Sequence, residues 1–109
     1  MIFEYRKYVA APGKLGAIHQ MFAQPITRLF ERHGMDVLAY WTPVVGGSSI
    51  SELHYILRWA DMTAMQDAWA SFYRDPEWAE AAGAFQSEGP LLTETENQVW
   101  ALTPYSPVP

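Results

Sequence analysis

Two side chains of opposite charge alternate with aromatic ones near the start of the chain, in the stretch FEYRKYV at residues 3–9. In an extended strand Glu4 and Arg6 lie on the same face, because side chains repeat every second residue. If that face lines a pocket, Arg6 could orient an anionic or enol substrate while Glu4 acts as an acid or a base. If it does not, the two form a structural ion pair, which contributes little when exposed and needs full hydrogen bonding when buried. Both interpretations stay open.

Two of the three histidines are further candidates for proton transfer. His19 falls in the middle of an expected helix, on a stripe that faces the sheet, and His54 falls on an expected strand. Each is either a core histidine with one hydrogen bond or a base that removes a proton from an acidic carbon. No metal site is predicted, because His19 and His33 would lie roughly 20 Å apart along a helix and the chain has no cysteine. We expect no cofactor, with haem bound through one histidine as the alternative.

Aromatic residues make up 15% of the chain, and many of them fall on expected strands. By default such side chains belong to the core or to a subunit interface, but together they would also suit the wall of an apolar pocket with a few polar tips. The predicted substrate-binding residues are Tyr5, Tyr8, Tyr40, Trp41 and Trp59.

Four strands must position these side chains. Alternation and β-branched or aromatic residues predict strands at 2–9, 35–42 and 52–59, and a last strand within 91–102. The short glycine–serine turn at 44–51 makes the second and third strands an antiparallel hairpin. In the second strand, alternation places Val37, Ala39 and Trp41 on one face and Leu38 and Tyr40 on the other.

Apolar residues three and four apart predict a helix over 15–33. Pro12 suits its first turn, Pro25 should kink it or divide it in two, and Gly34 should end it in a left-handed conformation.

A second helical region follows the third strand. Asp61 or Thr63 can cap a helix that runs to about Tyr73, and Asp75 followed by Pro76 restarts a helix that fades before residues 87–90.

The resulting order, β-α-β-β-α-β, is that of a ferredoxin-like α+β subunit with an antiparallel four-stranded sheet. The chain forms one domain over 1–109, with a proline-rich tail at 103–109. Neither hairpin strand has a cleanly polar face, although a sheet covered by helices on one side should show one. Only 17% of the residues are charged, against roughly 25% in ordinary globular chains. We therefore expect a homodimer whose two sheets pack back to back.

Charge and hydropathy exclude other classes of partner. The net charge is −5, and the seven Lys and Arg residues are scattered, so no nucleic acid is expected. No apolar run approaches the length of a transmembrane helix, and the charged N-terminus does not suit a signal peptide. The expected location is the cytoplasm.

Five short motifs stand in order along the chain: FEYRKYVAAPGKL at 3–15, YWT and Gly46 at 40–46, LHYILRWAD at 53–61, DPEW at 75–78 and TPYSP at 103–107. In this order and spacing they resemble the NIPSNAP family. The resemblance implies a dimeric α/β barrel, in which two ferredoxin-like subunits pair sheet to sheet. It also implies relatives among cofactor-independent oxygenases, haem-degrading enzymes and cyclases that act on small aromatic or polyketide-like molecules.

Two functions of different classes follow. The first is a cofactor-independent enzyme of oxygenase, cyclase or isomerase type, in which His19 or His54 removes a proton while Arg6 and tyrosine hydroxyls stabilise the enolate. The second is a non-catalytic dimer that binds a small apolar ligand or a partner protein, because the chain has no phosphate loop, nucleophile elbow or metal-ligand cluster. A fully packed core without a cavity near the two histidines would favour the second.

Overall fold

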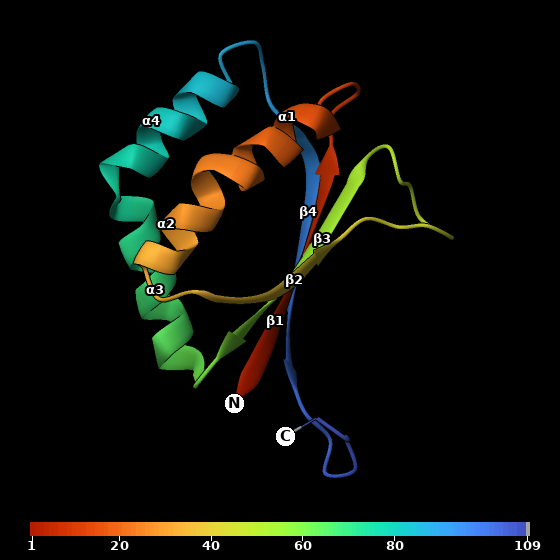
Figure 1. Cartoon of the computed structure of the whole chain (residues 1–109), viewed down its shortest axis with the longest axis vertical. Coiled ribbons are helices and arrows are strands. Elements are labelled where there is room, and N and C mark those ends of the chain that lie inside the picture. The colour runs from red at the N-terminus through yellow and green to blue at the C-terminus, as the bar shows by residue number, and fades with distance from the viewer. Residues whose placement is uncertain (109) are drawn as a thin grey trace.

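The computed structural model describes residues 1–108. Four strands form one antiparallel sheet in the order β2-β3-β1-β4: β1 Ile2–Ala10, β2 Asp36–Trp41, β3 Glu52–Trp59 and β4 Leu92–Ala101. The sequence positions and the strand order are those of the ferredoxin-like arrangement, so the predicted fold class is confirmed (Figure 1).

The first helical region is divided near Pro25, as predicted. It consists of α1 Leu15–Met21, a π-helical turn η1 Phe22–Ile26 and α2 Thr27–Arg32. Gln24 leaves the helical conformation, with φ −164° and ψ 117°, immediately before the proline. This agrees with the steric conflict between a proline ring and a helical preceding residue. Gly34 ends the region with a φ of 69°, which other residues rarely adopt.

The second helical region also follows its cap residues. Asp61 accepts a hydrogen bond from Ala64 N and begins α3 Met62–Arg74. Asp75 is extended and accepts a hydrogen bond from Glu77 N, and it begins α4 Pro76–Phe85. These cap interactions satisfy backbone N–H groups that have no partner within a helix.

Two local expectations are wrong. Pro12 lies in a turn before α1, closed by a 2.9 Å hydrogen bond from Lys14 N to Ala11 O, and not in the first helical turn. In β2, an irregularity between Val37 and Ala39 shifts the register, so Val37 pairs with Leu57 and Tyr40 with Tyr55. Val37 and Tyr40 therefore share the helix-facing side, because an extra residue interrupts the alternation between them.

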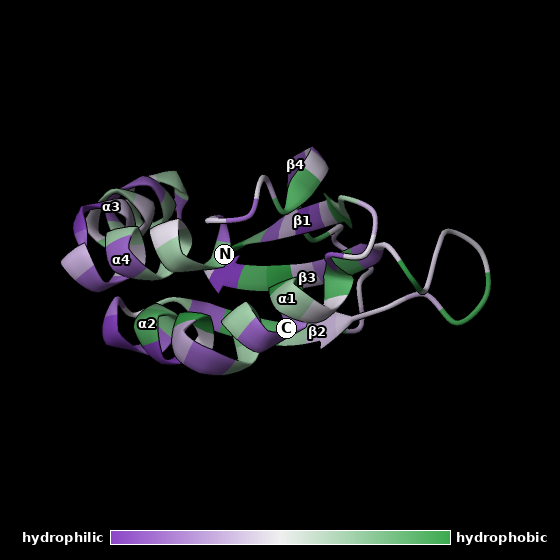
Figure 2. Ribbon diagram, turned by 90° about the horizontal axis from the view of Figure 1, so that it is seen from above, coloured by the Kyte–Doolittle hydropathy of each residue, from purple (hydrophilic) through white to green (hydrophobic). Residues whose placement is uncertain are grey.

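The helices all lie on one side of the sheet, and the other face is uncovered (Figures 1 and 2). The core fills the space between these two layers; Ile18, Leu29, Tyr55, Leu57 and Phe72 are its most completely buried large side chains. On the uncovered side the β2–β3 loop projects beyond the sheet, and Val44 and Val45 near its tip are 95% and 94% exposed. Within residues 1–108, no helix is long and apolar enough to cross a membrane.

Candidate functional site

A cavity of about 380 Å³ lies between the helices and the sheet. Every helical segment contributes to its wall, and α3 contributes three of the six aromatic rings. The aromatic part of the wall consists of Phe22, Phe30, Trp69, Phe72, Tyr73 and Trp78. These rings also pack on one another, mostly edge to face, with centroids 4.9–6.2 Å apart. The arrangement is typical of a site for a flat, mainly apolar molecule.

Strand β1 contributes Arg6 and Tyr8 to the polar part of the wall, which also includes Gln86 and Thr95. The side chains of Arg6 and Tyr8 lie on the same face of the strand because they are two residues apart. Among the described residues that line the cavity, Arg6 is the one that carries a charge. The cavity thus combines a broad aromatic surface with one cationic end.

Glu4 lies behind Arg6 and is 1% exposed. Its Oε1 atom accepts hydrogen bonds from Trp59 Nε1 at 3.0 Å and Trp69 Nε1 at 2.8 Å. Its Oε2 atom accepts one from Arg6 Nη1 at 3.0 Å and one from Asn97 Nδ2. Four donors fill the acceptor capacity of a carboxylate. This geometry favours the structural interpretation of Glu4: it holds Arg6 in place and has no free position for a substrate proton.

The Arg6 guanidinium is fixed on three sides. Besides the ion pair with Glu4, its Nε and Nη2 atoms donate to the Tyr8 hydroxyl, and its Cζ atom lies 4.3 Å from the centre of the Trp69 ring. Burial disfavours the charged form, but Tyr55, Tyr8 and Glu4 outweigh this effect and raise the pKa of Arg6 above its ordinary value. The group is a permanent, preorganised cation at the cavity wall.

Two further tyrosines lie next to this network. The Tyr55 hydroxyl is 2.9 Å from that of Tyr8, and burial, followed by the proximity of Tyr8, raises the pKa of Tyr55. Tyr40 packs edge to face on Phe22, and burial raises its pKa to about 12. The Tyr40 hydroxyl is buried and has no hydrogen-bond partner within residues 1–108.

The structure separates the two histidines from the cavity. His19 is exposed on α1, so the expectation that it faces the sheet is wrong. His54 is half-buried on the uncovered face of the sheet, where its Nδ1 atom lies 2.7 Å from the Tyr5 hydroxyl and its Nε2 atom lies 2.9 Å from Glu52 Oε1. Neither histidine is among the described lining residues. The cavity lies away from both histidines, so a base role for either one has no support in the geometry, and on this criterion the non-catalytic alternative is favoured.

The predicted substrate-binding residues divide between the two faces. Tyr8 lines the cavity, whereas Trp59 is buried behind it as a donor to Glu4. Tyr5 and Trp41 lie on the uncovered face with His54. Tyr5 stacks on Trp100 with ring centroids 5.1 Å apart, and burial together with the Glu96 carboxylate raises the pKa of Tyr5.

Trp69 and Asn97 are functional candidates that the sequence analysis did not single out. Trp69 covers the guanidinium and donates to Glu4, and Asn97 donates to the same carboxylate from β4. A signal for Trp69 was present, since Met65, Trp69 and Phe72 follow the i, i+4, i+7 spacing of a core-facing stripe. Asn97 stands in a run of polar residues, TETENQ at 93–98, that carries no such signal.

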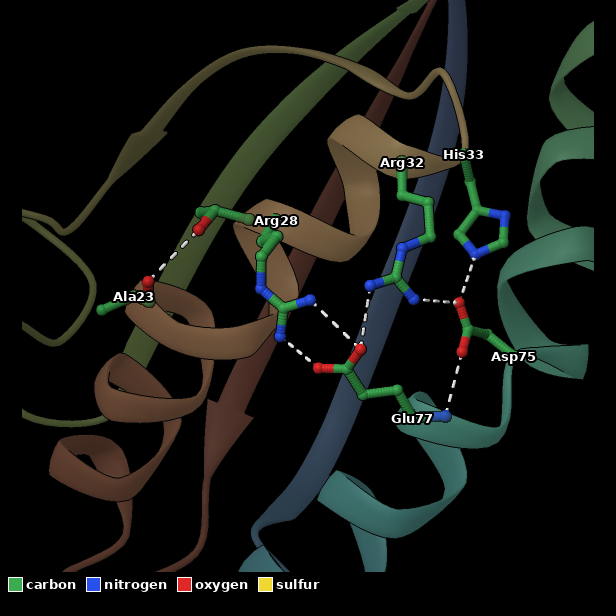
Figure 3. Close-up of polar contacts among 7 residues, drawn as sticks. Ala23, Arg28, Arg32, His33, Asp75 and Glu77 are labelled. Atoms are coloured by element: carbon green, nitrogen blue, oxygen red, sulfur yellow. Dashed lines mark hydrogen bonds and ion pairs between the residues drawn. The ribbon is translucent and has the colours of Figure 1, made fainter.

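A second polar cluster joins α2 to the start of α4 (Figure 3). Arg28 and Arg32 both bind the Glu77 carboxylate, while Arg32 and His33 bind Asp75. Hydrogen bonds from His33, from Glu77 N and from Arg32 lower the pKa of Asp75 to about 2. Those from Arg28 and Arg32 lower the pKa of Glu77 to about 2. The cluster ties together two helices that line the cavity.

No combination of these polar groups resembles a metal centre. Within residues 1–108, no group of three or more His, Asp or Glu side chains could hold a metal ion.

Comparison with known proteins agrees with this architecture. The NIPSNAP family model matches residues 3–107. A NIPSNAP family protein of Agrobacterium tumefaciens superposes with a TM-score of 0.85 at 17% identity, covering 99% of this chain and 98% of that chain. A NIPSNAP-like domain protein of Burkholderia xenovorans gives 0.82 at 20% identity, covering 97% and 88%. SnoaB, a cofactor-independent oxygenase from Streptomyces nogalater, gives 0.60 at 17% identity, covering 97% and 96%. Curated proteins yield no match.

Proposed function

This chain belongs to the NIPSNAP family, and we propose that it binds a small, flat, largely apolar molecule in the cavity between its helices and its sheet. The observation that carries the proposal is the wall of that cavity, in which aromatic rings surround a single charged side chain, Arg6. Its volume of about 380 Å³ is within the usual range for ligand sites, roughly 300–1,000 Å³. An aromatic or polyketide-like molecule with an oxygen atom directed at Arg6 fits this composition.

The proposed activity is a cofactor-independent reaction of oxygenase, cyclase or isomerase type on such a molecule. Two observations support it. SnoaB, which shares the fold, is a cofactor-independent oxygenase. Arg6 is held rigidly by Glu4, Tyr8 and Trp69, and a preorganised cation of this kind stabilises negative charge as it develops on a substrate oxygen.

The uncovered face of the sheet supports a second part of the proposal, a homodimer formed sheet to sheet. Trp41 and Trp100 are 45% and 42% exposed there, and Ile56 lies between Tyr5 and Ala39 in the same register. Large apolar side chains gathered on one face are typical of a surface that another protein covers. The charge-poor composition of the chain points to the same arrangement.

Binding can be tested by calorimetry with 2-naphthol, a flat two-ring molecule with one hydroxyl. We expect the wild-type protein to bind it. Gln86 is exposed yet lines the cavity, so Gln86→Trp should obstruct the entrance and weaken binding about tenfold, which is a loss of about 1.4 kcal/mol. Glu88→Trp is the matched control, because Glu88 is exposed in the same turn and is not among the lining residues. Absence of binding, or equal binding by all three proteins, would overturn the proposed site.

A further inference from the structure

The Tyr8 hydroxyl lies among three groups that can donate hydrogen bonds to it. Arg6 Nε is 3.3 Å away, Arg6 Nη2 is 3.2 Å away and the Tyr55 hydroxyl is 2.9 Å away. A guanidinium has no acceptor, so both contacts with Arg6 run from nitrogen to the Tyr8 oxygen. The direction of the third bond, between the two tyrosines, then decides where the Tyr8 proton points.

Burial settles that direction. Tyr55 is 0% exposed, and among the described residues Tyr8 is the neighbour of its hydroxyl that can accept a hydrogen bond, because Arg6 can only donate. If Tyr55 accepted from Tyr8, its own proton would be buried without a partner, which costs about 1–3 kcal/mol. The favoured arrangement has Tyr55 donating to Tyr8. The oxygen of Tyr8 then receives the Arg6 fork on one side and the Tyr55 O–H on the other.

The proton of Tyr8 is left for the cavity, which its side chain lines. Arg6 lines the cavity as well, and Glu4 and Tyr8 are the partners of three of its five N–H groups. No acidic side chain is among the described residues of the wall. Near Arg6 and Tyr8, therefore, the cavity offers O–H and N–H donors to an acceptor atom of a bound molecule. The neutral side chains of Gln86 and Thr95 also line the wall, and Thr95 stands opposite Tyr8 on β4.

We infer that the cavity selects an enol or a phenol and holds it as its oxyanion, with the Tyr8 O–H donating to the charged oxygen beside Arg6. The inference deepens the proposed function and rests on it, since it concerns the same cavity. The step changes one O–H bond. The O–H bond of the bound molecule breaks and its proton goes to solvent. The electron pair stays on the oxygen, which accepts a hydrogen bond from the intact Tyr8 O–H. No group is oxidised or reduced.

The ligand class follows from the shape and the donors together. Aromatic walls accommodate a planar ring system, and an enol or phenol attached to such a ring becomes a delocalised anion when it ionises. Arg6 alone would not specify this class, because Glu4 already balances its charge. Tyr8 adds an O–H donor that is aimed at one place on the cavity wall. A hydrogen bond to a charged acceptor is roughly twice as strong as one to a neutral acceptor, so this donor favours an oxyanion.

The test is a pH titration of bound 2-naphthol, followed by the separate absorbance bands of naphthol and naphtholate. We expect the wild-type protein to bind naphtholate about tenfold more tightly than naphthol, the fold-change that one charged hydrogen bond supplies, so that ionisation of the bound probe moves to lower pH than in water. Tyr8→Phe keeps the ring and removes the donor, and this preference should disappear. Tyr40→Phe is the matched control, because it removes a buried hydroxyl without a partner in the described chain, and it should keep the preference.

The outcomes separate the two proposals, with naphthalene as a probe that lacks the hydroxyl. If 2-naphthol binds but ionises as it does in water, or if Tyr8→Phe keeps the wild-type preference, the inference is wrong and the binding site stands. Ionisation of bound 2-naphthol at the same pH as in water can be seen with the wild-type protein alone. The inference can therefore be refuted even if Tyr8→Phe folds poorly. If naphthalene binds and 2-naphthol does not, the inference is also wrong. If neither binds, the proposed binding site fails together with the inference.

Discussion

The Nη1 atom of Arg6 lies 3.0 Å from Oε2 of Glu4, two residues earlier on the same strand, and the carboxylate is almost completely buried. The pair is therefore internal to the protein and also borders the cavity, with Arg6 at the wall and Glu4 behind it. A buried charge is tolerated only when it is paired and hydrogen-bonded. Here Trp59, Trp69 and Asn97 complete the shell around the carboxylate.

Glu4→Gln should destabilise the protein strongly. Glutamine preserves the size of the side chain but places an N–H₂ group where donors converge, and it leaves Arg6 without its counter-ion. Breaking a buried pair in this way costs roughly 3–5 kcal/mol in the free energy of unfolding, measured by urea denaturation. Glu94→Gln, at an exposed position on β4, should change that free energy by less than about 0.5 kcal/mol. Equal changes in the free energy of unfolding for the two substitutions would show that the hydrogen bonds of Glu4 do not stabilise the protein.

Substituting the histidines should leave binding in the cavity unchanged. His19 is exposed on α1, and His54 lies on the opposite face of the sheet. We expect His19→Ala and His54→Ala to bind 2-naphthol as the wild type does. Arg6→Lys should weaken binding about tenfold, because an ammonium group cannot contact Glu4 and Tyr8 with the fixed fork of a guanidinium. Calorimetry compares the three variants, and a loss of binding in either histidine variant would contradict this assignment.

The contact between α2 and α4 should weaken in acid. The pKa values of Asp75 and Glu77 are about 2 in the folded protein, against roughly 4 in an unfolded chain. Because folding lowers these values, their contribution to stability is fully present above about pH 4 and is lost as the pH falls through about 2. The melting temperature should therefore fall over this range. Asp75→Asn, which can still cap α4, and Glu77→Gln should each make the decrease shallower; a decrease as steep as in the wild type would contradict the assignment.

Trp100→Asp should prevent association of the protein. The tryptophan lies on the uncovered face, stacked on Tyr5, and a carboxylate there would have to be desolvated between two sheets. Light scattering at micromolar concentration should give the mass of a dimer for the wild type and of a monomer for the variant. Met62→Asp, at an exposed apolar position at the start of α3, should remain dimeric. A wild-type monomer would refute the proposed dimer.

Much of the fold could be predicted from the sequence because its elements have clear periods and caps. Strand β3 alternates strictly between buried and partly exposed residues, and Asp61 and Asp75 begin their helices as expected. The register of β2 could not be predicted, since a bulge is defined by the strand opposite. Val37 and Tyr40 reach the same face only because β2 carries one extra residue relative to β3, the strand with which it pairs.

The candidate site was predicted in part, and the limits have a physical cause. Alternation placed Glu4 and Arg6 on a common face. The partner of Arg6 across the cavity, however, depends on how α3 packs over β1, which brings Trp69 onto the guanidinium. His19 illustrates the reverse case. It borders an apolar stripe whose members Leu15, Ile18 and Phe22 are buried, yet the helix is rotated so that the imidazole reaches solvent. The spacing of apolar residues alone does not determine whether a residue that borders the apolar stripe of a helix is buried or exposed.

Alternate residues of strand β1 point to opposite sides of the sheet. Arg6 and Tyr8 face the cavity, while Tyr5 and Lys7 face the uncovered side. Strand β1 is also an inner strand, hydrogen-bonded to β3 and β4. A ligand that shifts Arg6 would therefore act on the backbone that also carries the proposed dimer face. In a sheet-to-sheet dimer, the two cavities would then be energetically coupled through the two packed sheets. The consequence is cooperativity, which a Hill coefficient different from one for 2-naphthol would reveal and a coefficient of one would exclude.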